Sequence, residues 1–280
     1  MKSRLDVAMV QKGLVVSRSQ AESWVRLGKV SVNGKPARKA GQMVSDTDNI
    51  HLNAKEQYVS RAGLKLASVA RALGLKFDGK TVLDVGSSTG GFTDFALQHG
   101  AKKVFAVDVG TEQLHPSLRS DTRIELHEKT DIRDVYRESQ STKPSETASR
   151  RASVAYAAAE ARAADASDSL LSGFPARVYI HETPDIVVMD VSFISLREIL
   201  PHIAKLCQPH TQVVAMLKPQ FEAGKHQVNK GVIKNDAVRR QILKDFEAWA
   251  KQYFIIVDKA DSEVAGTKGN RERFYLLKPL

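Results

Sequence analysis

Cysteine is almost absent from this sequence of 280 residues: Cys207 is the only one, so the chain cannot form an internal disulfide. It ends the apolar, helix-like run Ile203 to Cys207 and has no histidine or second cysteine beside it. We therefore expect Cys207 to pack in the core as a small apolar side chain, and we expect no metal site.

Long apolar runs are missing as well. No stretch approaches the roughly 20 apolar residues that cross a bilayer, and the start of the chain lacks the apolar run of a signal peptide. These absences predict a cytoplasmic protein without stable membrane association.

Acidic residues are outnumbered, because 42 Lys and Arg against 32 Asp and Glu leave a formal net charge of +10. Phosphates attract such a chain at long range and release counterions on contact. A polyanionic partner is therefore expected. Nucleic acid is the leading candidate, and an anionic membrane surface is the rival.

Residues 1–56 read as a small, basic α+β domain. A helix beginning near Leu5 closes at Gly13, and a second helix, which Ser17 can cap, ends at Gly28. Asn33-Gly34 then predicts a tight hairpin. We expect phosphate contacts from the basic side chains of this domain, namely Arg4, Arg18, Arg26, Lys29, Lys35, Arg38 and Lys39.

After a predicted linker at 57–64, the remainder of the chain, 65–280, alternates helices with apolar strands. This pattern is typical of a Rossmann-like α/β fold, a parallel sheet with helices on both faces. Helices are expected near 61–73, 91–99, 195–206 and 236–251. Seven strands are expected at 81–85, 103–109, 123–127, 185–190, 212–218, 254–260 and 273–278.

Residues 137–180 break this alternation. They are rich in Ser and Ala, and a packed loop of such length would be unusual. We interpret them as a flexible insertion whose Ala-rich part can be helical. Arg150 and Arg151 leave open a role in RNA contact.

A glycine-rich loop from Asp84 to Thr93 lies where the first expected strand of the sheet turns into a helix. A dinucleotide fingerprint needs glycine at the position of Ser88, so NAD is disfavoured. Asp84 would repel a pyrophosphate but attract the ammonium group of S-adenosylmethionine, so charge favours that sulfonium cofactor.

Two further acidic residues follow the next strands. Asp108 is placed to accept hydrogen bonds from a ribose diol, and Asp131 could hold an adenine edge. Each could instead be a turn or a helix cap, but ligands bind at the carboxyl ends of such strands. The predicted cofactor-binding residues are Asp84, Gly86, Ser88, Gly90, Gly91, Phe92, Thr93, Asp108, Val109, Asp131, Ile132 and Asp190.

Four charged residues are candidates for catalysis: Lys65, Asp190, Lys218 and Glu272. Methyl transfer to a ribose hydroxyl needs the hydroxyl to lose its proton as it attacks. A lysine held between carboxylates could stabilise the developing charge or accept the proton. The alternative is that Lys65 and Glu272 are ordinary surface charges.

Together these motifs resemble the haemolysin A (TlyA) family, in which an S4 RNA-binding domain precedes an FtsJ-like ribose 2′-O-methyltransferase. The similar segments are 4–36, 58–66, 84–94, 105–110, 190–196, 217–224 and 269–272. The resemblance implies S-adenosylmethionine as cofactor and a Lys-Asp-Lys-Glu tetrad at Lys65, Asp190, Lys218 and Glu272. It also implies a cytidine ribose in 16S or 23S ribosomal RNA, within ribosomal subunits, as substrate.

Two other classes of function stay open from the sequence. A membrane-lytic protein would match the haemolysin name but lacks a spanning segment, and liposome leakage would support it. A non-enzymatic rRNA-binding assembly factor would need no cofactor, so affinity for S-adenosylmethionine would count against it.

Overall fold

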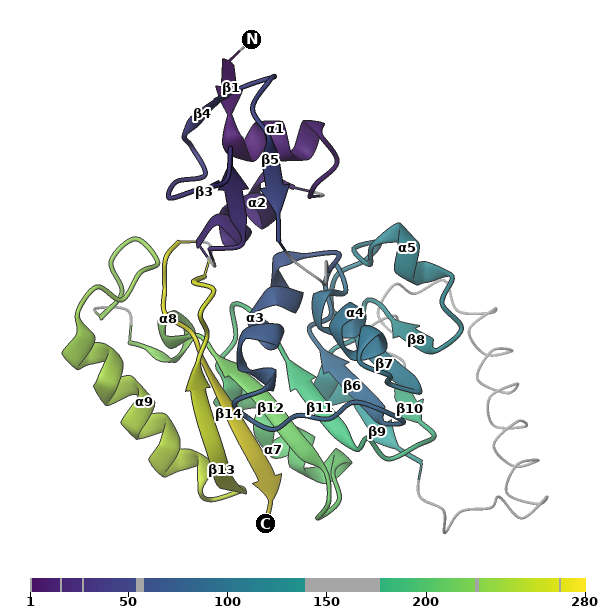
Figure 1. Ribbon diagram of the computed structural model, residues 1–280. Helices are drawn as coiled ribbons and strands as arrows, with labels where there is room; N and C mark the ends of the chain where they lie inside the picture. Colours follow the sequence, from purple (N-terminus) through teal and green to yellow (C-terminus); the bar gives the residue numbers. More distant parts are fainter. Residues whose placement is uncertain are drawn as a thin grey trace, which may run out of the picture.

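The computed structural model describes residues 2–15, 17–26, 28–53, 58–138, 177–224, 227–266 and 268–280. It contains a small domain formed by the first 53 residues and a larger α/β domain beneath it in the view of Figure 1.

The small domain has two helices, α1 (Leu5–Gln11) and α2 (Arg18–Arg26), followed by short strands. Gly13 adopts φ +66° after α1, and the Ser17 hydroxyl accepts a hydrogen bond from Gln20 N at 3.2 Å, so the predicted helix end and cap are confirmed. The strands are β1 (Lys2–Arg4), which pairs with β4 (Met43–Ser45), and β2 (Val30–Val32), which pairs with β3 (Lys35–Pro36) and β5 (Ile50–Leu52).

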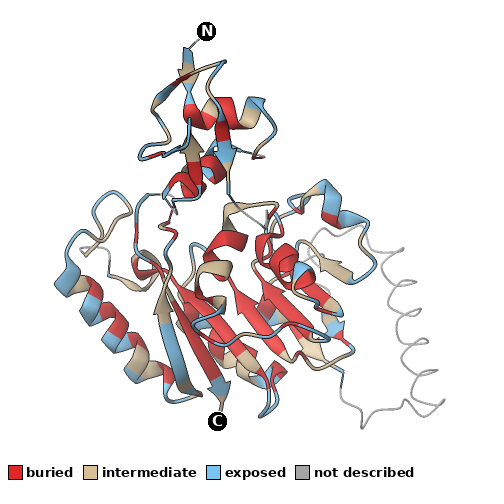
Figure 2. Cartoon of the chain, in the orientation of Figure 1, coloured by how far each residue is buried: buried red, intermediate tan, exposed pale blue. Residues whose placement is uncertain are grey.

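The large domain is built on a seven-stranded sheet, and all seven predicted strands are present. In spatial order they are β13 (Phe254–Asp261), β14 (Arg273–Pro279), β12 (Gln212–Leu217), β11 (Ile186–Met189), β6 (Thr81–Val85), β7 (Lys103–Val107) and β8 (Ile124–His127). The inner strands β6, β11 and β12 are buried on both faces, which explains their continuous apolar runs, whereas the edge strand β13 is largely exposed (Figure 2).

The prediction of a parallel sheet was wrong at one edge. β14 runs antiparallel to both β12 and β13, so the sheet is mixed. The connection between β13 and β14 is too short for the helical crossover that a parallel pair requires, and the chain must therefore turn back.

Helices cover both faces of the sheet. On one face α3 (Arg61–Ala70) and α4 (Gly91–Gln98) pack in a core with one set of strand residues; on the other, α7 (Leu196–Leu206) and α9 (Asp236–Ala250) pack with the alternate set. The shorter helices are α5 (Pro116–Arg119), the 3-10 turn η1 (Ile132–Asp134) and α8 (Pro219–Glu222).

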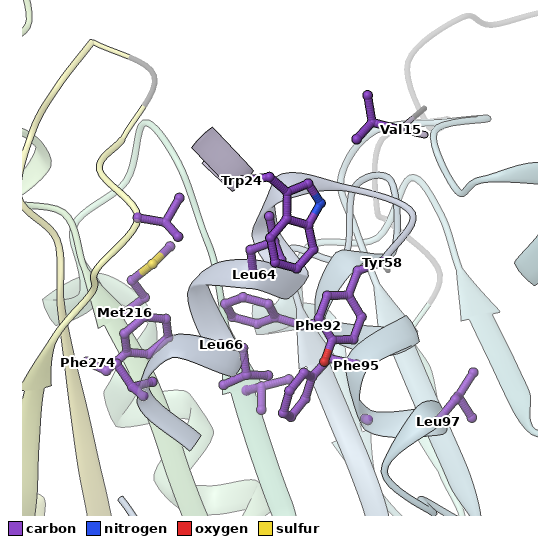
Figure 3. Close-up of a cluster of buried hydrophobic side chains, with 14 of the residues drawn as sticks. Val15, Trp24, Tyr58, Leu64, Leu66, Phe92, Phe95, Leu97, Met216 and Phe274 are labelled. Atoms are coloured by element: carbon purple, nitrogen blue, oxygen red, sulfur yellow. The ribbon is translucent and has the colours of Figure 1, made fainter. Parts of the chain in front are cut away.

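The core beneath α3 continues into the small domain. Trp24 of α2 lies next to Leu64 of α3 and near Tyr58 (Figure 3). The buried amide of Gln20 also donates a 2.6 Å hydrogen bond to Tyr58 O. Arg61 to Leu64 form the first turn of α3, as the helix predicted near 61–73 requires, although the predicted linker at 57–64 also includes them.

The two ends of the predicted insertion at 137–180 are strands rather than loop. β9 (Val135–Arg137) pairs in parallel with β10 (Val178–Ile180), and Glu138 N also donates to Ile180 O. Residues 139–176, including Arg150 and Arg151, lie outside the described residues.

Candidate active site

The four residues predicted to be catalytic meet at one edge of the sheet. Asp190 directly follows β11 and Lys218 directly follows β12, and these parallel neighbours end together. Glu272 immediately precedes β14, whose first residue pairs with the last residue of β12 because the two strands are antiparallel. Lys65 reaches this edge from α3.

These residues form two buried ion pairs. Lys65 Nζ lies 2.6 Å from Glu272 Oε2, and Lys218 Nζ lies 2.6 Å from Asp190 Oδ1. Exposed fractions of the four side chains are between 3% and 15%. This burial rules out the alternative that Lys65 and Glu272 are ordinary surface charges. Charges held this far from water are normally paired.

Three cavities adjoin this cluster. Cavity 1, of about 360 Å³, lies at the ends of β6 and β7 and includes Asp108 and Ile132. Cavity 2, of about 140 Å³, includes Asp84 and Phe92, and cavity 3, of about 440 Å³, includes Lys65 and Glu272. Asp190 lines the first two, Lys218 lines the last two, and Ser192 lines all three.

The loop after β6 separates cavities 1 and 2. Gly86 and Ser88 line both cavities and adopt φ angles of +79° and +45°. A Cβ at Gly86 would lie 3.2 Å from Asp190 O, so a larger residue would crowd the catalytic edge. The carboxylate of Asp108 fixes this loop by accepting hydrogen bonds from Ser88 N at 2.8 Å and from Gly110 N at 2.7 Å.

Asp84 is completely buried beneath cavity 2. The Thr93 hydroxyl donates to its Oδ2 at 2.7 Å, while Oδ1 has no hydrogen-bond partner among the described residues. Burial raises the pKa of this carboxyl to about 7, with a smaller contribution from the negative charge of Asp190, while the Thr93 bond opposes the rise. An unpaired buried carboxylate oxygen beside a cavity favours a cationic ligand.

Asp131 lines cavity 1, and its carboxylate accepts hydrogen bonds from its own turn. It caps η1 through Arg133 N and pairs with the Arg133 guanidinium at 2.9 and 2.6 Å, and this hydrogen bonding lowers its pKa. Ile132 and the exposed Val109 line cavity 1 beside it.

Three predicted cofactor-binding residues, Gly90, Gly91 and Thr93, do not line the three cavities. A Cβ at Gly90 would collide with Leu114 and Leu118 at 2.6 and 2.5 Å. One at Gly91 would lie 2.8 Å from Gly63 N of α3. Packing of α4 therefore accounts for both glycines.

Sequence reasoning missed several residues of the site. Ser192 accepts a 2.7 Å hydrogen bond from Lys218, and Phe193 beside it is 92% exposed with φ +65° and lies 5.3 Å from the ring of Phe221. Glu222 ties these loops together, since it accepts hydrogen bonds from Ser195 Oγ and Leu196 N, both at 2.7 Å. The motif Asp190 to Leu196 was the available signal.

The predicted RNA-binding residues do not form a single cluster in the small domain. Arg4, Arg26, Arg38 and Lys39 line one cavity of about 300 Å³, together with Asp6 and Glu22. Arg4 and Arg18 both pair with the buried Asp6, and Arg26 pairs with Glu22. Lys29 and Lys35 are exposed outside that cavity.

Comparison with known proteins matches residues 58–278 to the FtsJ-like methyltransferase family and residues 3–50 to the S4 domain. A protein named Hemolysin A from Brachyspira hyodysenteriae is 35% identical, covering 96% of this chain and 97% of its own length. A protein from Mycobacterium tuberculosis named 16S/23S rRNA (cytidine-2′-O)-methyltransferase TlyA is 32% identical over 99% of this chain and 90% of its own.

A solved structure of a hemolysin-named protein from Streptococcus thermophilus is also similar, with a TM-score of 0.62 at 34% identity, covering 99% of this chain and 88% of that one. The mixed α/β sheet, its glycine loop and the two lysine–carboxylate pairs thus define a Rossmann-like methyltransferase carrying an S4 domain. The chain belongs to the haemolysin A (TlyA) family of FtsJ-like methyltransferases.

Proposed function

We propose that this protein binds S-adenosylmethionine in cavities 1 and 2 and methylates the ribose 2′-hydroxyl of a cytidine in ribosomal RNA. The observation that carries the proposal is the placement of Lys218, held by Asp190 and Ser192 where cavities 2 and 3 adjoin. The named activities of relatives from Mycobacterium tuberculosis and Campylobacter jejuni support the choice of cytidine.

The residues around cavities 1 and 2 fit this cofactor. Asp84 Oδ1 offers a buried, unpaired acceptor for the amino-acid ammonium group, and Gly86 leaves room for close approach. Asp108 is the acidic residue suited to the ribose diol, and Ile132 and Val109 supply apolar surface for adenine. Asp131 pairs with Arg133, but its Oδ2 accepts only one hydrogen bond from the described residues, so the side chain keeps an acceptor for the adenine edge.

When bound, S-adenosylmethionine supplies a methyl group on a positively charged sulfur. The chain's own part is to hold the ribose oxygen in line with that methyl and to stabilise the oxygen as its proton passes to water. Lys218 can donate an N–H to this oxygen, because Asp190 and Ser192 fix its position from the protein side. The Lys65–Glu272 pair also lines cavity 3, where the nucleoside would enter.

RNA would be recruited by two surfaces. The small domain presents exposed basic side chains, including Lys29, Lys35 and Lys39, that attract phosphates. At the mouth of the active site, the exposed ring of Phe193 offers a face on which an unstacked base can lie. Ribosomal subunits are the expected partner, and the cytoplasm is the expected location of the protein.

The test is methyl transfer from tritiated S-adenosylmethionine to ribosomal subunits that lack the modification, followed by mapping of the labelled nucleotide. The wild-type protein should label a cytidine ribose. Lys218→Ala should bind RNA and cofactor within about twofold of wild type while its turnover falls at least about 100-fold. Label on a base, or full turnover by the variant, would reject the proposal.

The two rival functions receive less support. Among the described residues no helix is long and apolar enough to span a membrane. A non-enzymatic assembly factor would have no use for buried lysine–carboxylate pairs beside a cavity. Binding to ribosomal subunits with neither cofactor affinity nor methyl transfer would restore that second candidate.

A further inference from the structure

Ser192 stands apart from the other polar residues of the active site because it lines all three cavities. It is exposed, and its hydroxyl accepts a hydrogen bond from Lys218 Nζ at 2.7 Å. It lies two residues after Asp190, in the loop that leads from β11 to α7.

The two contacts of Lys218 differ in character. Asp190 Oδ1 lies 2.6 Å from the ammonium, yet that oxygen receives no hydrogen bond of good geometry from the described residues. The bond to Ser192 does have such geometry. Charge therefore holds the ammonium near Asp190, while Ser192 sets the direction of its N–H groups.

Direction matters for a lysine more than for most charged residues. Its ammonium group is a compact charge that rotates freely at the end of a flexible chain. One N–H directed at Ser192 fixes the rotation of the ammonium about its Cε–Nζ bond, so the directions of the other two N–H groups are fixed as well. An ammonium that met Asp190 alone could turn about that contact.

We infer that Ser192 is a positioning residue for the methyl-transfer step: by accepting a hydrogen bond from Lys218, it aims another N–H of that lysine at the acceptor ribose oxygen. The hydroxyl hydrogen of Ser192 has no acceptor among the described residues, so it is available to a ligand in the adjoining cavities. The inference rests on the proposed function, because it presumes that the acceptor oxygen reaches Lys218.

Single-turnover methylation of ribosomal subunits by the full-length protein tests this. Ser192→Ala should lower the rate about 10- to 100-fold, the usual range for a hydrogen bond to a charged group. The KM for RNA and the Kd for S-adenosylhomocysteine should stay within about twofold. Ser192→Thr, which keeps the hydroxyl, should recover most of the rate.

Ser195→Ala is the matched control. It removes a hydroxyl from the same loop, but that hydroxyl bonds to Glu222 and to Arg197 N rather than to Lys218. It should lower thermal stability and leave the single-turnover rate within about threefold. A rate for Ser192→Ala within twofold of wild type, an equal loss in both alanine variants, or no recovery with threonine would overturn the inference. An inactive wild-type protein would instead defeat the proposed function.

Discussion

Cofactor affinity should depend on pH through Asp84. Its carboxyl is completely buried and has a pKa of about 7, so it is mostly protonated at pH 6 and mostly ionised at pH 7.5. Only the ionised form can pair with the cofactor ammonium, which itself stays largely charged in this window. The ionised fraction of Asp84 rises roughly eightfold between these pH values, while the charged fraction of the cofactor amino group falls by about a third, so the association constant should rise about five- to sixfold.

Calorimetric titration with S-adenosylhomocysteine, which carries the same ammonium group, measures this effect. Asp84→Asn keeps the size of the side chain but cannot ionise, so its affinity should be low and nearly independent of pH. An equal pH slope in the variant, or a flat wild-type profile, would show that Asp84 does not bind the ammonium.

The same carboxyl affects stability without cofactor. Because its folded-state pKa is raised, its contribution to stability is fully present below its ordinary value of 3.8 and is lost as pH rises through 7. The free energy of unfolding should therefore fall over that range by at most about 4 kcal/mol. Asp84→Asn should lack this decline, which denaturant titrations at several pH values would reveal.

Three further substitutions have defined outcomes. Gly91→Ala would place a methyl group 2.8 Å from Gly63 N, so it should destabilise the fold by about 1–3 kcal/mol in denaturant titrations. It should also reduce turnover, because α3 would shift. Unchanged stability would contradict this packing. Asn235→Ala removes the side chain that caps α9 by accepting a hydrogen bond from Ala237 N at 2.8 Å. It should lower the free energy of unfolding by about 1 kcal/mol and leave turnover unaffected. A loss of turnover would show that α9 contributes to the active site. Replacing the exposed Lys29, Lys35 and Lys39 by Gln should reduce the log–log salt slope of rRNA binding by about two, and an unaltered slope would place the RNA surface elsewhere.

The sequence was sufficient for the elements that leave a strong pattern. The apolar runs at 81–85 and 212–217 are strands because both of their faces are buried, and such runs can be read without knowing their neighbours. The direction of β14 left no such trace, since a buried strand has the same composition in either direction. β9 and β10 are too short to show any periodicity.

The candidate site was predictable where a residue's position followed from a strand end. Asp190 and Lys218 directly follow parallel neighbours, so their meeting could be foreseen. The roles of Gly91 and Ser192 could not be, because each depends on a contact with a distant segment: Gly91 with α3, and Ser192 with the lysine after β12. The pairing of Asp131 with Arg133, which is only two residues away, was not expected either.

The position of Lys218 relative to a bound acceptor is the most direct test of the catalytic account. A structure of the protein with S-adenosylhomocysteine and a ribosomal subunit would measure the distance from Lys218 Nζ to the 2′-oxygen of the target cytidine. We predict a distance of about 3 Å. The sulfur should face the 2′-oxygen across the position that the transferred methyl group would occupy. A ribose bound beyond the reach of Lys218, with the lysine still paired with Asp190, would contradict the catalytic role of Lys218.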